Sequence, residues 1–295
     1  MKKLILFVFL LPLLFSCEQE KPQPPNIVFI MSDDHAFQAV SAYGHGLNNT
    51  PNIDRIAQEG ALFNKGFVTN SICAPSRAVM LTGKHSFVNG KVDNVQDFNW
   101  EQPNFAKNLQ DAGYQTAMIG KIHLRGLPQG FDYSAVLPGQ GHYYNPDFII
   151  NGVKERIQGY VTSITTRLSL DWLKNKRDKT KPFLLLYHQK APHRNWQSEE
   201  KYLTLFDDKN FDFPDNFFDD YEGRPAAAAQ EMLTPLPKSK FPPHMAMVDT
   251  VAGDTILNFS LIPWAEKPNS TKNSNVLLPN NVRLGSMPIR PKTMP

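Results

Sequence analysis

Short apolar runs that alternate with helical patterns constrain the fold of this chain more than any other feature. Two of these runs, Asn26–Met31 and Pro182–Tyr187, are apolar at nearly every position. Such runs are typical of strands that are buried on both faces of a parallel sheet. The sequence therefore predicts an α/β fold, in which a mixed, mostly parallel sheet is flanked by helices.

The other expected elements follow from helix caps, glycine stops and hydrophobic spacing. Strands are expected over residues 61–69 and 114–119, and helices over 51–59, 75–82, 103–111 and 162–175. In sheets of this kind, ligands gather at the carboxyl ends of the strands. Polar clusters come directly after three of the predicted strands, so we expect a functional site at that edge.

The N-terminus has the pattern of an export signal. Lys2 and Lys3 precede the apolar run Leu4–Phe15, which is too short to span a bilayer comfortably. Residues 1–16 are therefore predicted to be a signal peptide. Cys17 follows at once, as in a bacterial lipobox, and residues 17–25 would be a polar tether. This predicts an exported lipoprotein, periplasmic or on the cell surface and anchored to the membrane by lipid on Cys17. An ordinary signal peptide with an incidental Cys17 is the alternative.

The rest of the chain divides near residue 231. Residues 26–231 carry the alternating pattern, whereas residues 232–295 are rich in proline and lack periodicity, which is typical of loops or disorder. Within this tail only residues 248–261 could form an element. The net charge of +3 is too small to indicate a nucleic-acid partner.

The run from Cys73 to Gly83 (CAPSRAVMLTG) carries the most specific chemistry. Pro75 fits the first turn of a helix, where its missing N–H is no loss. A helix N-terminus favours an anion, and Arg77 adds a fixed positive charge. The pattern predicts an anion site that the Cys73 side chain faces. The alternative is a buried structural cysteine at a turn.

This run resembles the signature of the type I sulfatases, and three further blocks of that family follow its order in the chain. They are Ser32-Asp33-Asp34-His35, Gly120-Lys121-Ile122-His123 and Ala191-Pro192-His193. The resemblance implies an alkaline-phosphatase-like sandwich for residues 26–231. The segments 128–132, 144–148 and 189–196 are similar to those of carbohydrate sulfatases that act on N-acetylglucosamine-6-sulfate.

The resemblance implies a sulfuric ester hydrolase that removes sulfate from a sulfated glycan. Cys73 would be oxidised to formylglycine by a formylglycine-generating enzyme or an anaerobic sulfatase-maturating enzyme. One oxygen of the hydrated aldehyde would attack sulfur and release the alcohol, and the second hydroxyl would then expel sulfate and regenerate the aldehyde. Each of these two steps would be easier than one direct displacement. Asp33, Asp34 and residue 73 would bind Ca²⁺ or Mg²⁺, because hard oxygen ligands suit these ions.

The other implied roles concern the substrate. Lys121 would hold a sulfate oxygen, and Arg77, with the metal, would lie beside the attacking oxygen of the formylglycine hydrate. His123 would contact that hydrate and serve as a base, and His193 would protonate the leaving alcohol. Plausible sugar contacts are His142, Tyr143, Tyr144, Arg194 and Trp196. His188 and Lys190, at the end of the same predicted strand, are expected to be supporting or core polar groups.

The chain departs from the family after about residue 230. The family's later Ser-Asp-x-Gly block, with its further metal ligands, has no counterpart in the sequence. We therefore expect a chain that is truncated at its C-terminal side, has little activity and exposes a long apolar sheet edge. Two alternative functions remain: a phosphate or phosphonate ester hydrolase of the same superfamily, and a non-catalytic lipoprotein that binds sulfated glycans.

Overall fold

The computed structural model describes residues 23–194, 196–211, 220–226, 246–251 and 254–259. The predicted signal peptide, Cys17 and most of the tether and of the 232–295 tail lie outside the described residues. In the tail, β7 (Ala246–Val251) and β8 (Asp254–Phe259) pair as an antiparallel hairpin, overlapping the segment for which the sequence allowed an element. Within the described part, no helix is both long and apolar enough to cross a bilayer.

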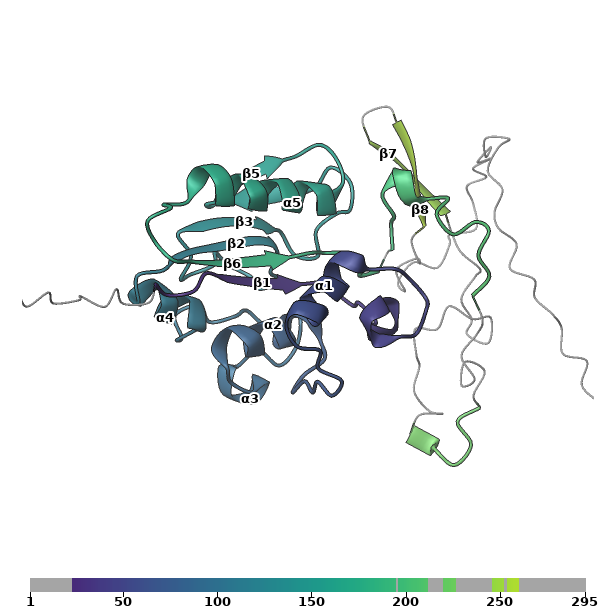
Figure 1. The fold of residues 1–295 in the computed structure, drawn as a ribbon, viewed down its shortest axis with the longest axis horizontal. Helices are drawn as coiled ribbons and strands as arrows, with labels where there is room; N and C mark the ends of the chain where they lie inside the picture. Colours follow the sequence, from purple (N-terminus) through teal and green to yellow (C-terminus); the bar gives the residue numbers. More distant parts are fainter. Residues whose placement is uncertain (1–22, 195, 212–219, 227–245, 252–253, 260–295) are drawn as a thin grey trace, which may run out of the picture.

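The centre of the molecule is a six-stranded mixed sheet with the order β1-β6-β2-β3-β4-β5 (Figure 1). Its first four strands in that order are parallel, and β4 and β5 continue it as antiparallel neighbours. The strands are β1 (Ile27–Met31), β2 (Gln115–Lys121), β3 (Tyr133–Leu137), β4 (Asp147–Ile150), β5 (Val153–Arg156) and β6 (Phe183–His188). The predicted α/β architecture with a mostly parallel sheet is confirmed.

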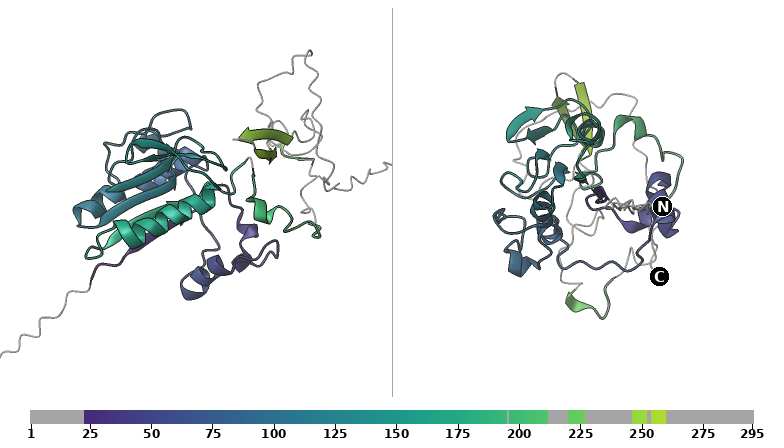
Figure 2. Two further views of the ribbon diagram at one scale, coloured as in Figure 1. Left: turned by 90° about the horizontal axis from the view of Figure 1, so that it is seen from above. Right: turned by 60° about the vertical axis from the view of Figure 1, so that its left-hand side comes forward.

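Helices cover both faces of this sheet (Figures 1 and 2). One core packs the sheet against α2 (Cys73–Thr82) and α4 (Phe105–Asp111), and the other packs it against α5 (Val161–Asp171). The described part of the chain also contains η1 (Phe37–Ala39), η2 (Ser41–Tyr43), α1 (Pro51–Glu59), α3 (Ser86–Asn89), η3 (Trp172–Lys176) and η4 (Glu200–Tyr202). The described part of residues 26–231 is thus a three-layer α/β sandwich.

The register of the parallel strands brings three chain segments to one edge. Met31 of β1 and Gly120 of β2 both lie opposite His188 of β6. The carboxyl ends of the three strands therefore coincide, and the polar residues that follow each strand emerge side by side. This is the edge at which the sequence predicted a functional site.

Four details of the sequence prediction need correction. Residues 61–69 do not form a strand: they pair with no described strand, and Phe67 is 91% exposed, so neither hydrogen bonds nor a core stabilise an extended segment there. Helix α2 begins at Cys73, two residues earlier than predicted. The predicted helix 162–175 is α5 followed by one π turn, η3. Strands β3, β4 and β5 were not predicted.

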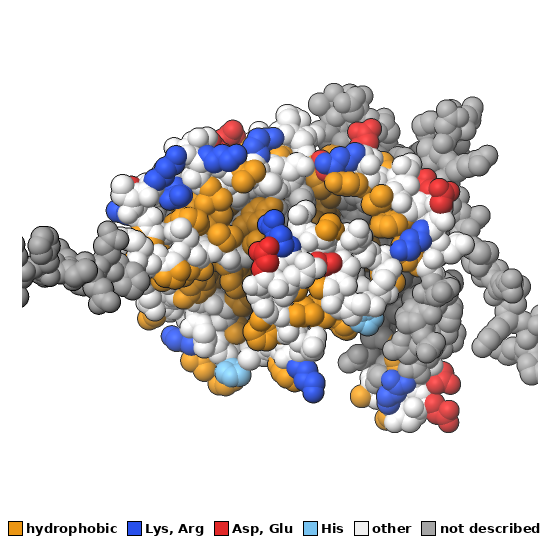
Figure 3. Space-filling model, in the orientation of Figure 1, with side chains coloured by type: hydrophobic (Ala, Val, Ile, Leu, Met, Phe, Trp, Pro, Cys, Tyr) orange, Lys and Arg blue, Asp and Glu red, His pale blue; other side chains and the backbone are white. Residues whose placement is uncertain are grey.

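Strand β1 forms one edge of the sheet. Its side chains alternate: Ile27 and Phe29 pack against the α2 and α4 core, whereas Val28 and Ile30 are 47% and 56% exposed. Hydrophobic side chains also gather on the face of the molecule seen in Figure 3. Strand β1 thus combines an edge position in the described sheet with apolar side chains that are exposed on one face.

Candidate active site

The site lies where the segments after β1, β2 and β6 meet the N-terminus of α2. The segments that leave β1 and β6 stay paired beyond the sheet. Gln189 N–H donates to the Met31 carbonyl (2.7 Å), and Asp33 N–H donates to the Ala191 carbonyl (3.2 Å). This pairing holds the acidic turn Asp33-Asp34 beside the loop that carries His193.

Cys73 occupies the first turn of α2 and is half-buried. The helix begins there because Ile72, in an extended conformation, ends the preceding segment and its carbonyl accepts the first helical bond from Ser76 N–H (2.8 Å). Ala74 N–H donates to the side chain of Asn94 (3.1 Å), which satisfies one of the free donors of the helix start. The Cys73 side chain is therefore fixed at the positive end of a buried helix.

Asp33 is the centre of a buried ionic network. Its carboxylate faces the Arg77 guanidinium (Oδ1 to Nη2, 3.3 Å) and also accepts a hydrogen bond from the Lys121 ammonium. Lys121 donates further to the Gln140 side chain, and Arg77 donates to the Lys121 carbonyl. Burial alone would raise the pKa of Asp33, but the two cations together hold it below its usual value. The Asp33 carboxylate is thus paired with two buried cations.

The Cys73 thiol is not prepared to act as a thiolate. Burial raises its pKa above the usual value, and the nearby negative charges of Asp33 and Asp34 raise it further. A thiolate nucleophile needs a lowered pKa. An unmodified Cys73 would therefore be a weak nucleophile, although it faces the cations of the site.

Two histidines at this edge are held in the neutral form. Burial, together with Lys121 and Arg77, lowers the pKa of His123 to about 4. Its backbone lies in the left-handed region (φ 52°), and its buried Nδ1 has no partner among the described residues. Burial and Arg77 likewise lower the pKa of His188 to about 3. Strained backbone and an unsatisfied ring nitrogen mark His123 as a functional position.

His193 lies between two acceptors. Its Nδ1 faces the Arg194 carbonyl, and its Nε2 lies 3.6 Å from a carboxylate oxygen of Asp34. The protonated ring could donate to both, although burial lowers its pKa from the usual value. The buried Tyr143 hydroxyl donates to the His193 carbonyl and so supports the loop. Tyr143, one of the plausible sugar contacts, is thus buried, and its hydroxyl supports the His193 loop.

Lys190 is a third buried cation at the same edge. Only 4% of its surface is exposed, and its ammonium lies 4.6 Å from the centre of the Tyr143 ring. Burial and the charge of Lys121 lower its pKa to about 8. Because the fold brings Lys190 beside the other charged groups, it is more central than the sequence indicated.

One group of potential metal ligands stands out at this edge. Single ligand atoms of Asp33, Cys73 and His193 all lie within 4.8 Å of one another. Asp34, the other predicted metal ligand, has a half-exposed carboxylate and a left-handed backbone (φ 57°) that turns it toward His193. Six of the predicted residues therefore share one centre with Asp34: Asp33, Cys73, Arg77, Lys121, His123 and His193.

The predicted sugar contacts lie outside this centre. His142, Arg194 and Trp196 are exposed, and they belong to the loops next to the buried Tyr143 and His193. Sequence reasoning missed Gln140, which accepts a hydrogen bond from Lys121, because nothing in its neighbourhood distinguishes it from a loop residue. Only the position of the loop that follows β3 reveals it.

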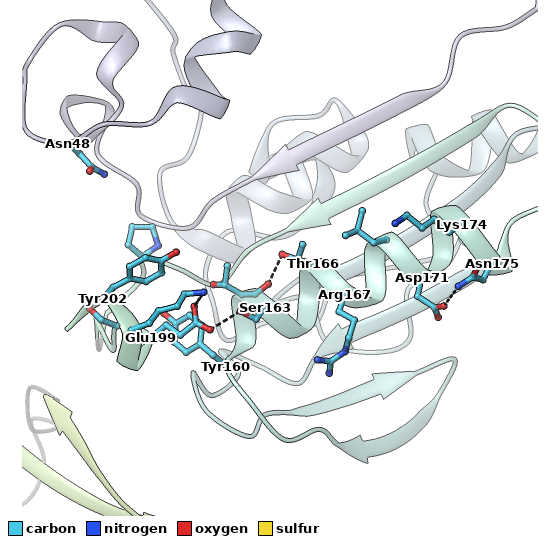
Figure 4. Close-up of a pocket in the computed structure, with 15 residues that line it drawn as sticks. Asn48, Tyr160, Ser163, Thr166, Arg167, Asp171, Lys174, Asn175, Glu199 and Tyr202 are labelled. Carbon is cyan, nitrogen blue, oxygen red and sulfur yellow. Dashed lines mark hydrogen bonds and ion pairs between the residues drawn. The ribbon is translucent and has the colours of Figure 1, made fainter. Parts of the chain in front are cut away.

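A separate open groove of about 920 Å³ runs along α5 (Figure 4). It is lined by Arg167 of α5 and Lys174 of η3, and by Glu199 and Tyr202 of the segment that follows the His193 loop. Of the loop residues 189–193 it includes only Pro192. The groove therefore adjoins the ionic centre without containing its reactive groups.

Comparison with known proteins gives the class to which this fold and site belong. The Sulfatase family model matches residues 25–232. The chain belongs to the sulfatase family. It is 50% identical over 235 residues to the N-acetylglucosamine-6-O-sulfatase of Bacteroides thetaiotaomicron, covering 76% of this chain and 42% of that protein. It is also 35% identical over 156 residues to human arylsulfatase D, covering 44% of this chain and 26% of that protein.

A solved protein structure has a similar fold. That protein was solved in complex with its substrate D-glucosamine-2-N,6-O-disulfate; its sequence is 52% identical to this chain, and the two structures superimpose with a TM-score of 0.69. The match covers 70% of this chain and 43% of that one. The chain thus spans less than half the length of these relatives. The similarity supports the alkaline-phosphatase-like fold that the resemblance implied.

Proposed function

We propose that this chain has the catalytic centre of a carbohydrate sulfatase, which hydrolyses the sulfate ester of a sulfated glycan. The observation that supports this most strongly is the grouping of Arg77 and Lys121 around Asp33, beside Cys73 at a helix N-terminus. Cations around the non-bridging oxygens of a sulfate ester stabilise the charge that develops during displacement. An N-acetylglucosamine-6-sulfate unit is the proposed target, because a 50% identical relative is named for that activity.

The nucleophile is proposed to be formylglycine made from Cys73. When present, its hydrated aldehyde supplies an oxygen nucleophile at this position. The raised pKa of the Cys73 thiol supports the need for such a modification, because the unmodified side chain is not activated. A formylglycine-generating or anaerobic sulfatase-maturating enzyme would be the partner that converts it.

The donor set fits a hard divalent cation once residue 73 presents oxygen. Asp33, Asp34 and residue 73 would hold Ca²⁺ or Mg²⁺, and the ion would supply further positive charge against the sulfate oxygens. These three protein ligands, all in the described part of the chain, would leave the other positions of the six to eight oxygens that Ca²⁺ takes to water and to oxygens of the sulfate ester.

The histidines of the chain would move the protons. Neutral His123, with an unpartnered Nδ1, can accept a proton or a hydrogen bond from the group at position 73. His193, once protonated, can donate from Nε2 to a leaving alcohol near Asp34. Arg77 and Lys121 would hold the sulfate so that the alcohol departs on the side of His193.

The exposed loop residues are proposed to contact the sugar. Arg194 and Trp196 extend the His193 loop, and His142 precedes the buried Tyr143. A planar guanidinium suits an acidic neighbour on the glycan, and an aromatic face suits a pyranose ring. Membrane anchoring through lipid on Cys17 remains part of the proposal, and a Cys17→Ser variant should be released from the membrane fraction.

The deciding experiment is mass spectrometry of the peptide across Ser71–Arg77, in protein from its native host. Conversion of cysteine to formylglycine lowers the peptide mass by about 18 Da, because SH₂ is exchanged for O. The same sample would be assayed on an aryl sulfate and an aryl phosphate, with Cys73→Ala as the control. Turnover of the phosphate alone would favour the phosphatase alternative. An unshifted peptide and glycan binding without turnover would favour the non-catalytic lipoprotein.

A further inference from the structure

Lys190 differs from the other two buried cations of the site in its partners. Arg77 and Lys121 both face the Asp33 carboxylate. Among the described residues, the Lys190 ammonium has no carboxylate within ion-pair distance and donates no hydrogen bond; its close neighbour is the Tyr143 ring. A buried ammonium is costly unless a negative charge compensates it. The uncompensated charge therefore points to a ligand that brings a negative charge.

The position of Lys190 ties it to the reacting groups. Its backbone carbonyl accepts from His193 N–H (3.1 Å), and the Tyr143 ring beneath its ammonium carries the hydroxyl that holds the His193 carbonyl. Asp33, Asp34 and Cys73 are near enough for their charges to act on it. Lys190 is thus fixed by two contacts at the same centre as the predicted nucleophile and acid.

The charges of the centre leave a positive excess. The centre holds two carboxylates, Asp33 and Asp34, and three buried cations, Arg77, Lys121 and Lys190, of which only the first two face a carboxylate. The neutral forms of His123 and His188 add no charge. A divalent metal would enlarge the excess. A singly charged sulfate ester would reduce the positive excess. Because Lys190 has no carboxylate partner in the described part of the chain, its ammonium is free to contact a sulfate oxygen.

We propose that Lys190 is a substrate-binding residue of this site, whose ammonium contacts an oxygen of the sulfate group at the Asp33–Cys73–His193 centre. The proposal rests on the sulfatase function proposed above and adds a residue to its anion site. Tyr143 would then be a positioning residue, because its ring holds the ammonium and its hydroxyl holds the His193 loop.

The test uses inorganic sulfate as the probe, because its binding does not require conversion of Cys73. Calorimetry would compare the full 295-residue chain with Lys190→Met, which keeps packing against the Tyr143 ring but removes the charge. Loss of one charge-assisted hydrogen bond should weaken binding about tenfold or more. Lys190→Arg should stay within about threefold of wild type, and the exposed Lys154→Met is the matched control that should not change.

A second measurement separates anion binding from a structural role. The side-chain nitrogen resonance of Lys190, assigned by its absence from Lys190→Met, should shift as sulfate is added to the wild-type chain. Unchanged sulfate affinity in Lys190→Met, or a stationary Lys190 resonance at saturating sulfate, would overturn the proposal. So would a Lys190→Met defect confined to a disulfated glucosamine and absent with inorganic sulfate, because Lys190 would then contact another anionic group.

These outcomes are independent of the test of the proposed function. A chain that carries formylglycine and hydrolyses a sulfate ester, but whose Lys190→Met variant binds sulfate normally, keeps the function and loses this residue. A wild-type chain that binds no sulfate loses the Lys190 contact, while the peptide mass and the turnover assay still report separately on the function.

Discussion

His188 should make the stability of the folded chain depend on pH in the acid range. The ring is buried at the end of β6, where Nδ1 lies 3.2 Å from both the Arg77 guanidinium and the Lys121 carbonyl. Burial and the Arg77 charge lower its pKa from 6.5 to about 3. Between these two values the unfolded chain binds a proton that the native chain does not. The free energy of unfolding therefore falls as the pH falls below 6.5.

The size of the effect follows from the two pKa values. One pKa unit corresponds to about 1.4 kcal/mol, so the loss attributable to His188 is about 2 kcal/mol at pH 5 and about 3 kcal/mol at pH 4, relative to pH 7. The limit, reached below pH 3, is about 5 kcal/mol. These losses are a large share of the 5–15 kcal/mol by which domains are usually stable.

Urea unfolding at pH 7, 6, 5 and 4 would measure this loss in the wild type and in His188→Asn. The asparagine stays neutral, so its curve of unfolding free energy against pH should be flatter by about 2 kcal/mol between pH 7 and pH 5. His45→Asn, at an exposed histidine, should run parallel to the wild type. Parallel curves for wild type and His188→Asn would refute a buried neutral His188.

Two other perturbations test how the fold builds the site. Gly120→Ala should destabilise the chain by roughly 3 kcal/mol or more, because Gly120 has φ +107° and an added Cβ would lie 1.8 Å from the His188 carbonyl oxygen. Thermal unfolding measures this loss, and a melting temperature equal to that of the wild type would contradict it. Ile30→Lys should change the unfolding free energy by less than about 0.5 kcal/mol but reduce self-association, because Ile30 is 56% exposed on the edge strand β1. Sedimentation velocity measures self-association, and equal association of the variant and the wild type would show that β1 is not the surface through which the chains associate.

The parts of the fold that the sequence predicted are those whose signal is local. The run that became β6 is apolar because both faces of that strand are covered, and β2 is likewise buried along most of its length. The run that became β1 is apolar as well, although one of its faces is exposed at Val28 and Ile30. Strands β4 and β5 are short and carry charged residues, so their pairing depends on neighbours that no local pattern identifies. The apolar run 61–69 shows the opposite error, since it has strand composition but no pairing partner among the described strands.

The candidate site was predictable to a similar degree and for a similar reason. The motif residues could be predicted one by one, because each block follows a strand or opens a helix. Their electrostatic coupling could not be predicted, since it depends on the register that places Gly120 and Met31 opposite His188. Gln140 and Lys190 entered the site only through that register and the loops beyond it.

The charge balance of the centre limits what it can bind. Asp33 alone cannot neutralise Arg77 and Lys121, and it is held ionised because they are there. A neutral ligand would leave the positive excess in a buried setting, whereas an anion with several equivalent oxygens could meet more than one cation at once. A tetrahedral oxyanion that carries one ester bond has three free oxygens for the cations, and its ester oxygen could accept a proton from a donor such as His193. Such a group complements the shape and the positive charge of this edge of the sheet.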